Sequence, residues 1–324
     1  RNTNGMLAPG MQLPAVVGAS APYQNTADMR TRGWELSVNW RDQIGKVGYR
    51  VGFNLSDSQS KIVKYNSNES GILTSTLSNG STFWNYYEGK DLGEIWGYEY
   101  DGFYTVDDFT DTSSWKLKEG VPSIDGYNPR PGDVKFKNLK DDDRGTNMIS
   151  SGDNTVSNPG DRKVIGNNTP RYLYGITLGA NFKGFDLNVF MQGTGKRDAW
   201  IANNLKFPLY SDFKFIALYK DLGNYWKPVD AANGDYTAAN PNAEFPRIYG
   251  NYGNQGSNYR QSDKYLSDAS YFRIKNVTLS YTFPKAWITK ASLSQLKAFV
   301  SIENLATFSS LPKGIDPETL SWNY

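Results

Sequence analysis

Alternating apolar and polar residues are the feature that most constrains how this chain folds. In Arg171–Phe182, tyrosine, isoleucine, leucine, alanine and phenylalanine occupy one set of alternate positions, and the other set is mostly small or polar. The chain then turns at Lys183–Gly184, and the alternation continues through Phe185–Gln192. Because successive side chains of a β-strand point to opposite faces, this segment predicts a hairpin with one apolar face.

The same pattern recurs along the chain. Four further segments carry it, which are residues 33–41, 46–57, 269–283 and 295–305. Within the third of these, the apolar positions change from even to odd numbers near Asn276, which predicts a β-bulge. Weaker strand signals lie at residues 93–104 and 132–137. Strands of about 9–11 residues with one apolar face are typical of a transmembrane β-barrel.

Composition restricts the classes of protein that remain. The chain has 324 residues, a mean hydropathy of −0.60 and 15% aromatic residues. No run approaches the roughly 18 apolar residues of a membrane helix, so a helical span is excluded. A barrel is compatible with this composition, because its lipid-facing residues alternate with polar ones. A soluble β-sandwich fits the composition as well and stays open as an alternative.

Charge and missing residue types exclude several chemistries. The net charge is +2 with both signs mixed along the chain, which gives no indication of a nucleic-acid partner. The chain has no Cys and no His, so disulfides, thiolate chemistry and imidazole bases or ligands are excluded within it. Its first residues are polar and lack the apolar core of a secretory signal, so we expect the chain to begin downstream of its gene's start.

The connections between the expected strands are very unequal in length. The short ones are Asp42–Gly45, Lys183–Gly184 and Pro284–Leu293, whereas residues 58–170 and 194–268 form very long linkers. Outer-membrane barrels have short periplasmic turns and longer external loops. A sandwich distributes its loops over both ends, so the inequality favours the barrel.

Strand direction follows from the same inequality. If the short turns are periplasmic, the strands alternate downward and upward, and both Arg1 and Tyr324 lie on the external side. Any strands hidden in residues 58–170 must then come as a pair, which suits the two weaker signals at 93–104 and 132–137. A complete barrel protein normally starts and finishes inside, so we expect this chain to be a piece of one.

Ordered motifs carry a family resemblance. Asn25–Leu36 resembles an Asn–x–Gly–x–x–x–Asn–x–Gly–x–Glu–Leu approach to a strand, and Gly89–Phe103 resembles a Gly–x–Pro–x–Gly–x–x–x–Gly–Tyr–x–x–x–Gly–Phe stretch, with Asp91 where proline is common. Further motifs follow in the same order, at Pro131–Asn138, Asp161–Gly166, Pro170–Gly175, Asp268–Tyr281, Asn304–Leu305 and Gly314–Glu318. Each motif is weak alone, but their order over residues 25–318 resembles the C-terminal half of the SusC/RagA family of TonB-dependent outer-membrane transporters.

The resemblance implies an all-β fold and a transport function. Residues 1–324 would be the C-terminal part of an antiparallel transmembrane β-barrel of about 22 strands, whose plug, early strands and final strand are not in this chain. Its expected partners are those remaining segments, TonB through the N-terminal part, outer-membrane lipid and a SusD-like lipoprotein over the external opening.

The expected activity is import of oligosaccharides or peptides across the outer membrane of a Gram-negative bacterium, with loops at the cell surface and no catalysis. The alternatives are a soluble or surface-attached glycan-binding β-sandwich and a passive porin. Paired acids such as Glu94 and Glu99 do not establish a glycosidase, because nothing in the sequence fixes their separation in a cleft.

Aromatic residues beside carboxylates are the candidates for contact with a substrate or with the lipoprotein. Ring faces suit the apolar faces of sugars, and amide and carboxylate oxygens accept hydrogen bonds from hydroxyls. The alternative is an interfacial aromatic girdle or packing within the loops. The candidates are Trp84, Tyr86, Tyr87, Trp96, Tyr98, Tyr249, Tyr252, Tyr259 and Arg260.

A calcium site is a further expectation from the resemblance. Asn138–Gly145 stands where relatives often carry an Asp–x–Asn–x–Asp–Gly loop, and hard cations need oxygen ligands at such alternating positions. Here the second position is Lys140, which cannot bind a cation. The expected Ca²⁺ ligands are therefore Asn138 and Asp142, joined by Asp141 and Asp161, and the alternative is a solvated acidic loop. No cofactor is required for the expected function.

Overall fold

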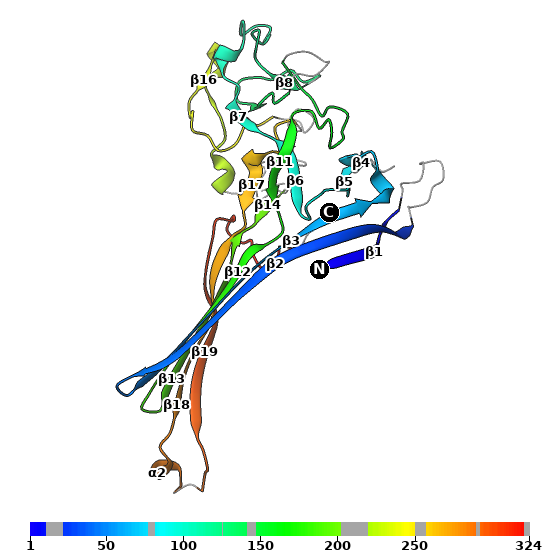
Figure 1. The fold of residues 1–324 in the computed structure, drawn as a ribbon. Coiled ribbons are helices and arrows are strands. Elements are labelled where there is room, and N and C mark those ends of the chain that lie inside the picture. Colours follow the sequence, from blue (N-terminus) through cyan, green and yellow to red (C-terminus); the bar gives the residue numbers. More distant parts are fainter. Residues whose placement is uncertain are drawn as a thin grey trace.

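The computed structural model describes residues 1–10, 22–76, 82–124, 126–140, 147–201, 220–249, 257–289 and 292–320. Its main element is a seven-stranded sheet in the order β1-β2-β3-β12-β13-β18-β19, in which every neighbouring pair is antiparallel (Figure 1). The strands are β1 (Asn2–Pro9), β2 (Tyr23–Ile44), β3 (Val47–Tyr65), β12 (Arg171–Phe182), β13 (Phe185–Lys196), β18 (Tyr271–Thr282) and β19 (Lys297–Ser309). The predicted all-β, antiparallel fold is confirmed, and all six expected strands are present.

The register of the sheet brings the alternating residues of each strand onto common faces. Phe53 of β3 lies opposite Val38 of β2 and Ile176 of β12, and Leu279 of β18 lies opposite Leu187 and Val300. Of these apolar side chains, Phe53 and Ile176 are half-buried, and the others are exposed among the described residues. For example, Val38 is 51% exposed and Val300 is 68% exposed. The sheet therefore has one continuous apolar face that water would solvate poorly.

The predicted bulge lies in β18. Both ladders of that strand shift register between Ile274 and Asn276, so Lys275 is an extra residue. Because a bulge places one more residue on one strand, the apolar side chains before and after it stay on the same face of the sheet.

The two ends of the sheet differ, as Figure 1 shows. At one end β2 and β3 join through Gly45–Lys46, and β12 and β13 join through Lys183–Gly184. Helix α2 (Lys285–Ile288) lies in the connection between β18 and β19 at this same end. The long connections lie at the other end. Arg1 donates a hydrogen bond from its amino group to the Thr31 carbonyl, toward that loop-rich end, and Tyr324 lies outside the described residues.

The two weaker strand signals were wrongly paired as a barrel hairpin. β3 is hydrogen-bonded directly to β12, so residues 58–170 add no strand between them. Residues 93–104 instead form β6 (Glu94–Tyr98), paired with β11 (Arg162–Asn167), and β7 (Tyr100–Phe103), paired with β9 (Val134–Phe136). These strands are too short to cross a bilayer. Their apolar residues face a small buried core, which produces the same alternation as a lipid-facing strand.

The remaining elements are short and belong to the two long connections. They are η2 (Asn66–Asn68), β4 (Thr74–Thr76), β5 (Thr82–Trp84), η3 (Val106–Asp108), β8 (Ser123–Ile124), β10 (Met148–Ile149), β14 (Asp198–Trp200), η4 (Lys220–Gly223), β15 (Pro228–Asp230), η5 (Ala231–Asn233), β16 (Asp235–Ala238), η6 (Asp263–Tyr265) and β17 (Leu266–Asp268). In the described ranges, no helix is both long enough and apolar enough to cross a membrane.

The two long connections fold against each other above the sheet. The Tyr98 amide donates a hydrogen bond to the Gln261 carbonyl at 2.9 Å, and Tyr98 and Ser262 form a parallel bridge. Tyr98 also packs in a buried cluster with Ile124, Val134, Phe136 and Ile149. We call the described parts of residues 66–167 and 198–268 the loop unit.

Candidate substrate- and partner-contact site

The first group of predicted contact residues lies at the base of the loop unit. Tyr87 and Trp96 are 4% and 8% exposed and pack with Leu73, and Trp84 packs against them. The Trp96 Nε1 donates a hydrogen bond to the Tyr87 hydroxyl at 3.0 Å, and that hydroxyl donates to Glu94. Burial and the neighbouring Glu94 carboxylate raise the pKa of Tyr87. Tyr87 and Trp96 are therefore part of the packing of the loop unit.

A buried lysine covers two rings of this group. Lys90 is 4% exposed, and its ammonium lies 5.5 Å from the ring centroids of both Tyr86 and Tyr87. Its Nζ donates a hydrogen bond to the Asn85 carbonyl at 2.9 Å. Burial lowers the pKa of Lys90. The aromatic faces thus stabilise a cation of the chain itself.

Trp84 and Tyr86 keep part of their surface accessible. Both are half-buried, and the Trp84 Nε1 donates a hydrogen bond to Gln261 Oε1 at 3.2 Å. The guanidinium of Arg162 lies 5.8 Å from the Trp84 ring centroid. Trp84 therefore joins residues that are far apart in sequence while presenting part of its ring at the surface.

Tyr98 and Arg260 were both predicted as contact residues, and the structure places them next to each other. Tyr98 is buried, and its ring centroid lies 5.4 Å from that of Phe136. Burial raises the pKa of Tyr98, and the nearby guanidinium groups of Arg260 and Arg162 oppose this. Tyr259 is buried as well and packs with Phe245 and Tyr265. Tyr252 lies outside the described residues.

Tyr249 is placed by a carboxylate that the sequence did not single out. Asp133 is fully buried, and its Oδ2 accepts hydrogen bonds from the hydroxyls of Tyr249 at 2.5 Å and Tyr127 at 2.8 Å. The same oxygen accepts from the Arg130 amide at 2.7 Å, and Oδ1 accepts from the Asn258 side chain at 3.1 Å. These bonds join the two long connections at one point.

The donors around Asp133 are all neutral. Burial therefore raises the pKa of the Asp133 carboxyl, although its hydrogen bonds oppose the rise. Burial together with the Asp133 carboxylate raises the pKa values of Tyr127 and Tyr249. Asp133 belongs to the Pro131–Asn138 motif, which is the feature of the sequence that could have indicated a structural role for this residue.

The predicted calcium ligands are only partly described. Asp161 is fully buried, and its carboxylate accepts hydrogen bonds from the amides of Leu139 at 2.7 Å, Lys140 at 3.1 Å and Ser150 at 2.8 Å. These three donors hold the loop around Asp161. Asp141 and Asp142 lie outside the described residues, and Asn138 is next to Leu139 in the same loop. In the described part of the chain, no group of three or more acidic side chains could hold a metal ion.

The polar face of the sheet has its own side-chain contacts. Arg50 of β3 lies across Gly179 of β12, where a Cβ would collide with the guanidinium. The Arg50 Nη2 donates a hydrogen bond to Asn188 of β13, and its Nη1 lies 3.7 Å from the Asp186 carboxylate. Because position 179 is glycine, the Arg50 side chain can pass over β12 and reach from β3 to β13.

Two open pockets lie where the strands meet the long connections. One of about 350 Å³ is lined by Gly33, Trp34, Glu35, Ser56, Asp57, Ser58, Pro170 and Leu173. Another of about 420 Å³ is lined by Tyr174, Thr194, Gly195, Ser270, Tyr271, Phe272, Phe308, Ser309 and Ser310. Among the described residues, none of the predicted contacts lines either pocket.

Comparison with curated proteins finds relatives that share most of this chain. It is 28% identical over 311 residues to TonB-dependent receptor P3 of Formosa agariphila, an alignment that covers 94% of this chain and 27% of that receptor. It is 22% identical over 322 residues to TonB-dependent receptor P26 of the same organism, covering 98% of this chain and 28% of that receptor. The chain therefore spans less than a third of the length of these relatives. No model of a known protein family matches the chain.

Solved structures show the same fold. The RagAB peptide transporter superposes with a TM-score of 0.65 at 18% identity, covering 98% of this chain and 29% of the solved one. The RagAB peptide importer in its open-open state gives a TM-score of 0.63 at 20% identity, with the same coverage. The arrangement of sheet and long connections described above is thus shared by known transporter structures.

Proposed function

The predicted resemblance to TonB-dependent transporters of the SusC/RagA type is confirmed over nearly the whole chain, and from it we propose that the chain forms part of the wall and surface loops of an outer-membrane importer. Residues 1–324 are the C-terminal part of its barrel. The remaining strands and a plug complete the pore. Uptake is driven through TonB, and the function is passage of a substrate without bond making or breaking.

The observation that carries this proposal is the apolar face of the sheet. It is continuous over neighbouring strands, exposed, and bounded by aromatic side chains. Near the loop-rich end the rings of Tyr174, Phe272 and Phe308 stack, with centroids 6.4 Å and 6.0 Å apart. Near the short turns, Phe185 and Tyr281 lie 4.6 Å apart.

The distance between these two aromatic levels fits a membrane. Along β12, Tyr174 and Phe182 mark the two levels. Their separation is about 27 Å of extended strand. Because barrel strands are tilted by about 35–45°, the two levels lie about 19–22 Å apart along the membrane normal, slightly less than an apolar band of about 25 Å. A soluble protein would need to cover this face.

The loop unit is the proposed contact surface for substrate and for a SusD-like lipoprotein. Trp84, Tyr86 and Tyr249 keep ring surface accessible, and they are the proposed contacts together with Arg260 and Tyr252. Tyr87, Trp96, Tyr98 and Tyr259 are buried and act by positioning them. The substrate class is oligosaccharides or peptides, since the same aromatic and polar residue types recognise both. Calcium at the Asp161 loop stays a proposal that transport does not require.

Uptake by intact cells tests the proposed function. Deleting the gene that contains this chain should abolish uptake of labelled oligosaccharide or peptide pools, and a plasmid copy should restore it. Dissipating the proton gradient should block uptake, because TonB-driven import depends on the inner membrane. Uptake that persists without the gradient would support a passive porin instead. Recovery of the protein in the soluble fraction without detergent would contradict any membrane function.

A further inference from the structure

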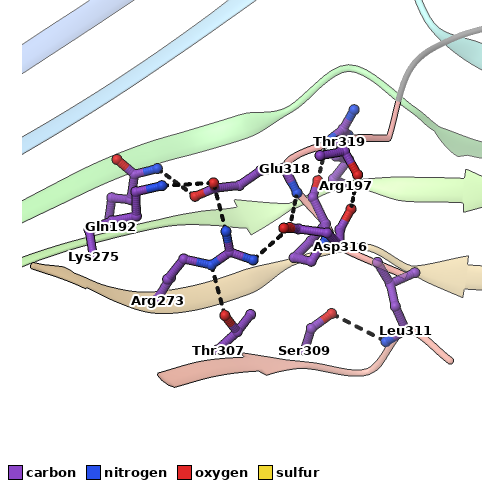
Figure 2. A network of polar contacts seen from close by, with 11 residues as sticks. Gln192, Arg197, Arg273, Lys275, Thr307, Ser309, Leu311, Asp316, Glu318 and Thr319 are labelled. Carbon is purple, nitrogen blue, oxygen red and sulfur yellow. Dashed lines mark hydrogen bonds and ion pairs between the residues drawn. The ribbon is translucent and has the colours of Figure 1, made fainter. Parts of the chain in front are cut away.

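Residues Leu311–Leu320 follow β19 and fold back over the polar face of the sheet; we call them the strap. Arg273 of β18 holds the strap from the sheet side (Figure 2). Its Nη1 donates a hydrogen bond to Glu318 Oε2 at 2.7 Å, and its Nη2 donates to Asp316 Oδ1 at 2.6 Å. Its Nε donates to Thr307 Oγ1 of β19 at 2.7 Å. The planar guanidinium is therefore fixed by the strap and the sheet together.

Two more side chains of the sheet reach the same glutamate. Gln192 of β13 donates from Nε2 to Glu318 Oε1 at 2.7 Å, and Lys275 donates from Nζ to Glu318 Oε2 at 2.9 Å. Gln192, Arg273 and Thr307 lie side by side in the register of three neighbouring strands. Arg273 itself is only 5% exposed. Three strands thus hold one short segment of the chain.

Arg197 holds the strap from the side of the loop unit. This residue connects β13 to β14 and is 6% exposed. Its Nη1 and Nη2 donate hydrogen bonds to the carbonyls of Pro317 and Leu320, both at 3.0 Å. Its Nε donates to the Asn168 carbonyl at 3.3 Å, and its own carbonyl accepts from the Ala269 amide at 2.8 Å. Arg197 therefore contacts the strap and two junctions at which the chain passes between loop unit and sheet.

Apolar contacts attach the strap to the same place. Leu311 is buried with Ala199, Ile201 and Ala269, and Ile315 and Leu320 pack against this cluster. Ala199 lies in β14, which pairs with β17. The strap is thus fixed to the sheet by charged groups and to the base of the loop unit by apolar packing and the Arg197 fork.

We propose that the strap couples the loop unit to the sheet, with Arg197 and Arg273 as its two positioning residues. Release of the strap at Arg273 loosens the β14–β17 pair, which Arg273 does not touch. Release at Arg197 loosens the strap where it crosses the sheet. The role that we assign to this coupling rests on the proposed function: the strap transmits movements of the loops during uptake to the barrel wall.

Hydrogen–deuterium exchange of the complete membrane protein in detergent tests the coupling. Arg273→Met should speed amide exchange about tenfold in residues 311–320 and also in β14 and β17, because hydrogen bonds to a charged group are lost. Arg197→Met should likewise speed amide exchange in residues 311–320 and, on the sheet side, at the start of β18. Arg273→Lys keeps the charge without the planar fork and should give an intermediate change.

A matched control comes from an exposed cation of the loop unit. Lys163 pairs with Glu99 and does not contact the strap, so Lys163→Met should change neither region. If Arg273→Met prevents assembly, Glu318→Gln is the milder variant and should give the same pattern at about threefold. Faster exchange confined to the strap and β18, with β14 and β17 unchanged, would overturn the coupling. The readout needs no substrate, so failure of the importer proposal would be seen separately in the uptake assay.

Discussion

At the scale of single residues, Asp133 shows how the two long connections are held together. Its donors Tyr249 and Asn258 are 116 and 125 residues away in sequence. No local pattern predicts such partners, because the distance between them is decided only when the sheet brings both connections to one end. The sequence pattern therefore indicates Tyr249 as an aromatic candidate but not the buried Asp133 carboxylate that positions it.

The raised pKa of Asp133 predicts a pH dependence for the loop unit. The pKa is higher in the folded protein than its ordinary value of 3.8, so the folded state binds the proton more tightly. Its contribution to stability is fully present below pH 3.8 and is lost as pH rises through the folded pKa. Tyr127 and Tyr249 stay protonated, since their pKa values are raised as well. Amide exchange in residues 127–134 should therefore become faster as pH rises from about 4, after correction for intrinsic exchange.

Asp133→Asn checks the source of this dependence. The amide keeps one acceptor oxygen and places an NH₂ group against the other donors, so local opening should become easier by about 1–3 kcal/mol. The pH dependence should disappear in the variant. Asp101→Asn is the matched control, because Asp101 is an exposed residue of β7. A pH dependence that survives Asp133→Asn would assign it to another group.

At the scale of elements, alternation predicted the strands that have one apolar face and failed elsewhere. β2, β3, β12, β13, β18 and β19 were expected because each carries the pattern for a length that can cross a membrane. β1 was missed because Asn2–Pro9 lacks the pattern and is held by its pairing with β2. Residues 93–104 and 132–137 carry the same alternation without being barrel strands. Their apolar residues Tyr98, Val134 and Phe136 pack into a small buried core within the loop unit.

The Lys183–Gly184 turn gives a prediction for the hairpin of β12 and β13. Both residues have positive φ, at 47° and 91°, as a type I′ turn requires. A Cβ at Gly184 would also lie 2.8 Å from the Thr282 carbonyl oxygen of β18. Gly184→Ala should therefore destabilise the barrel by about 1–2 kcal/mol. The urea midpoint of the purified complete protein in detergent measures this.

Lys183→Asn is the control for that turn. Asparagine adopts the left-handed conformation readily and precedes glycine in favoured type I′ turns, so the midpoint should stay the same or rise slightly. Equal losses in Gly184→Ala and Lys183→Asn would show that the turn responds to any substitution and would contradict the explanation from backbone conformation.

At the scale of the whole molecule, the sequence predicted which end carries the short turns and which strands they join, but not that β3 and β12 are neighbours. The length of each connection is the number of residues between two predicted strands, so the sequence alone shows which connections are short and which are long. The adjacency of β3 and β12 depends on pairing between Leu55 and Tyr174 across a very long connection. That pairing leaves residues 66–167 outside the sheet, and in their described part Asp133 holds them to the second long connection through Tyr249 and Asn258.

The proposed orientation gives the last prediction, which single cysteines can check because this chain contributes no thiol of its own. In intact cells, a membrane-impermeant maleimide should label Glu119→Cys in the loop unit. It should label Lys46→Cys, in the turn between β2 and β3, only after the outer membrane is permeabilised. Val51→Cys and Leu178→Cys lie on the apolar face and should react only in detergent or denaturant, since lipid excludes the reagent.

Each outcome of the labelling separates one part of the proposal from the others. Labelling in denaturant measures the total amount of reactive cysteine in each variant, and the labelling in cells is expressed as a fraction of that amount. Lys46→Cys reacting in intact cells would reverse the orientation while leaving the barrel in place. Val51→Cys and Leu178→Cys reacting as fast as Glu119→Cys would mean that water covers the apolar face. Because alternation alone cannot distinguish lipid from the covering layer of a soluble sandwich, this last comparison decides what the repeated pattern of apolar residues is for.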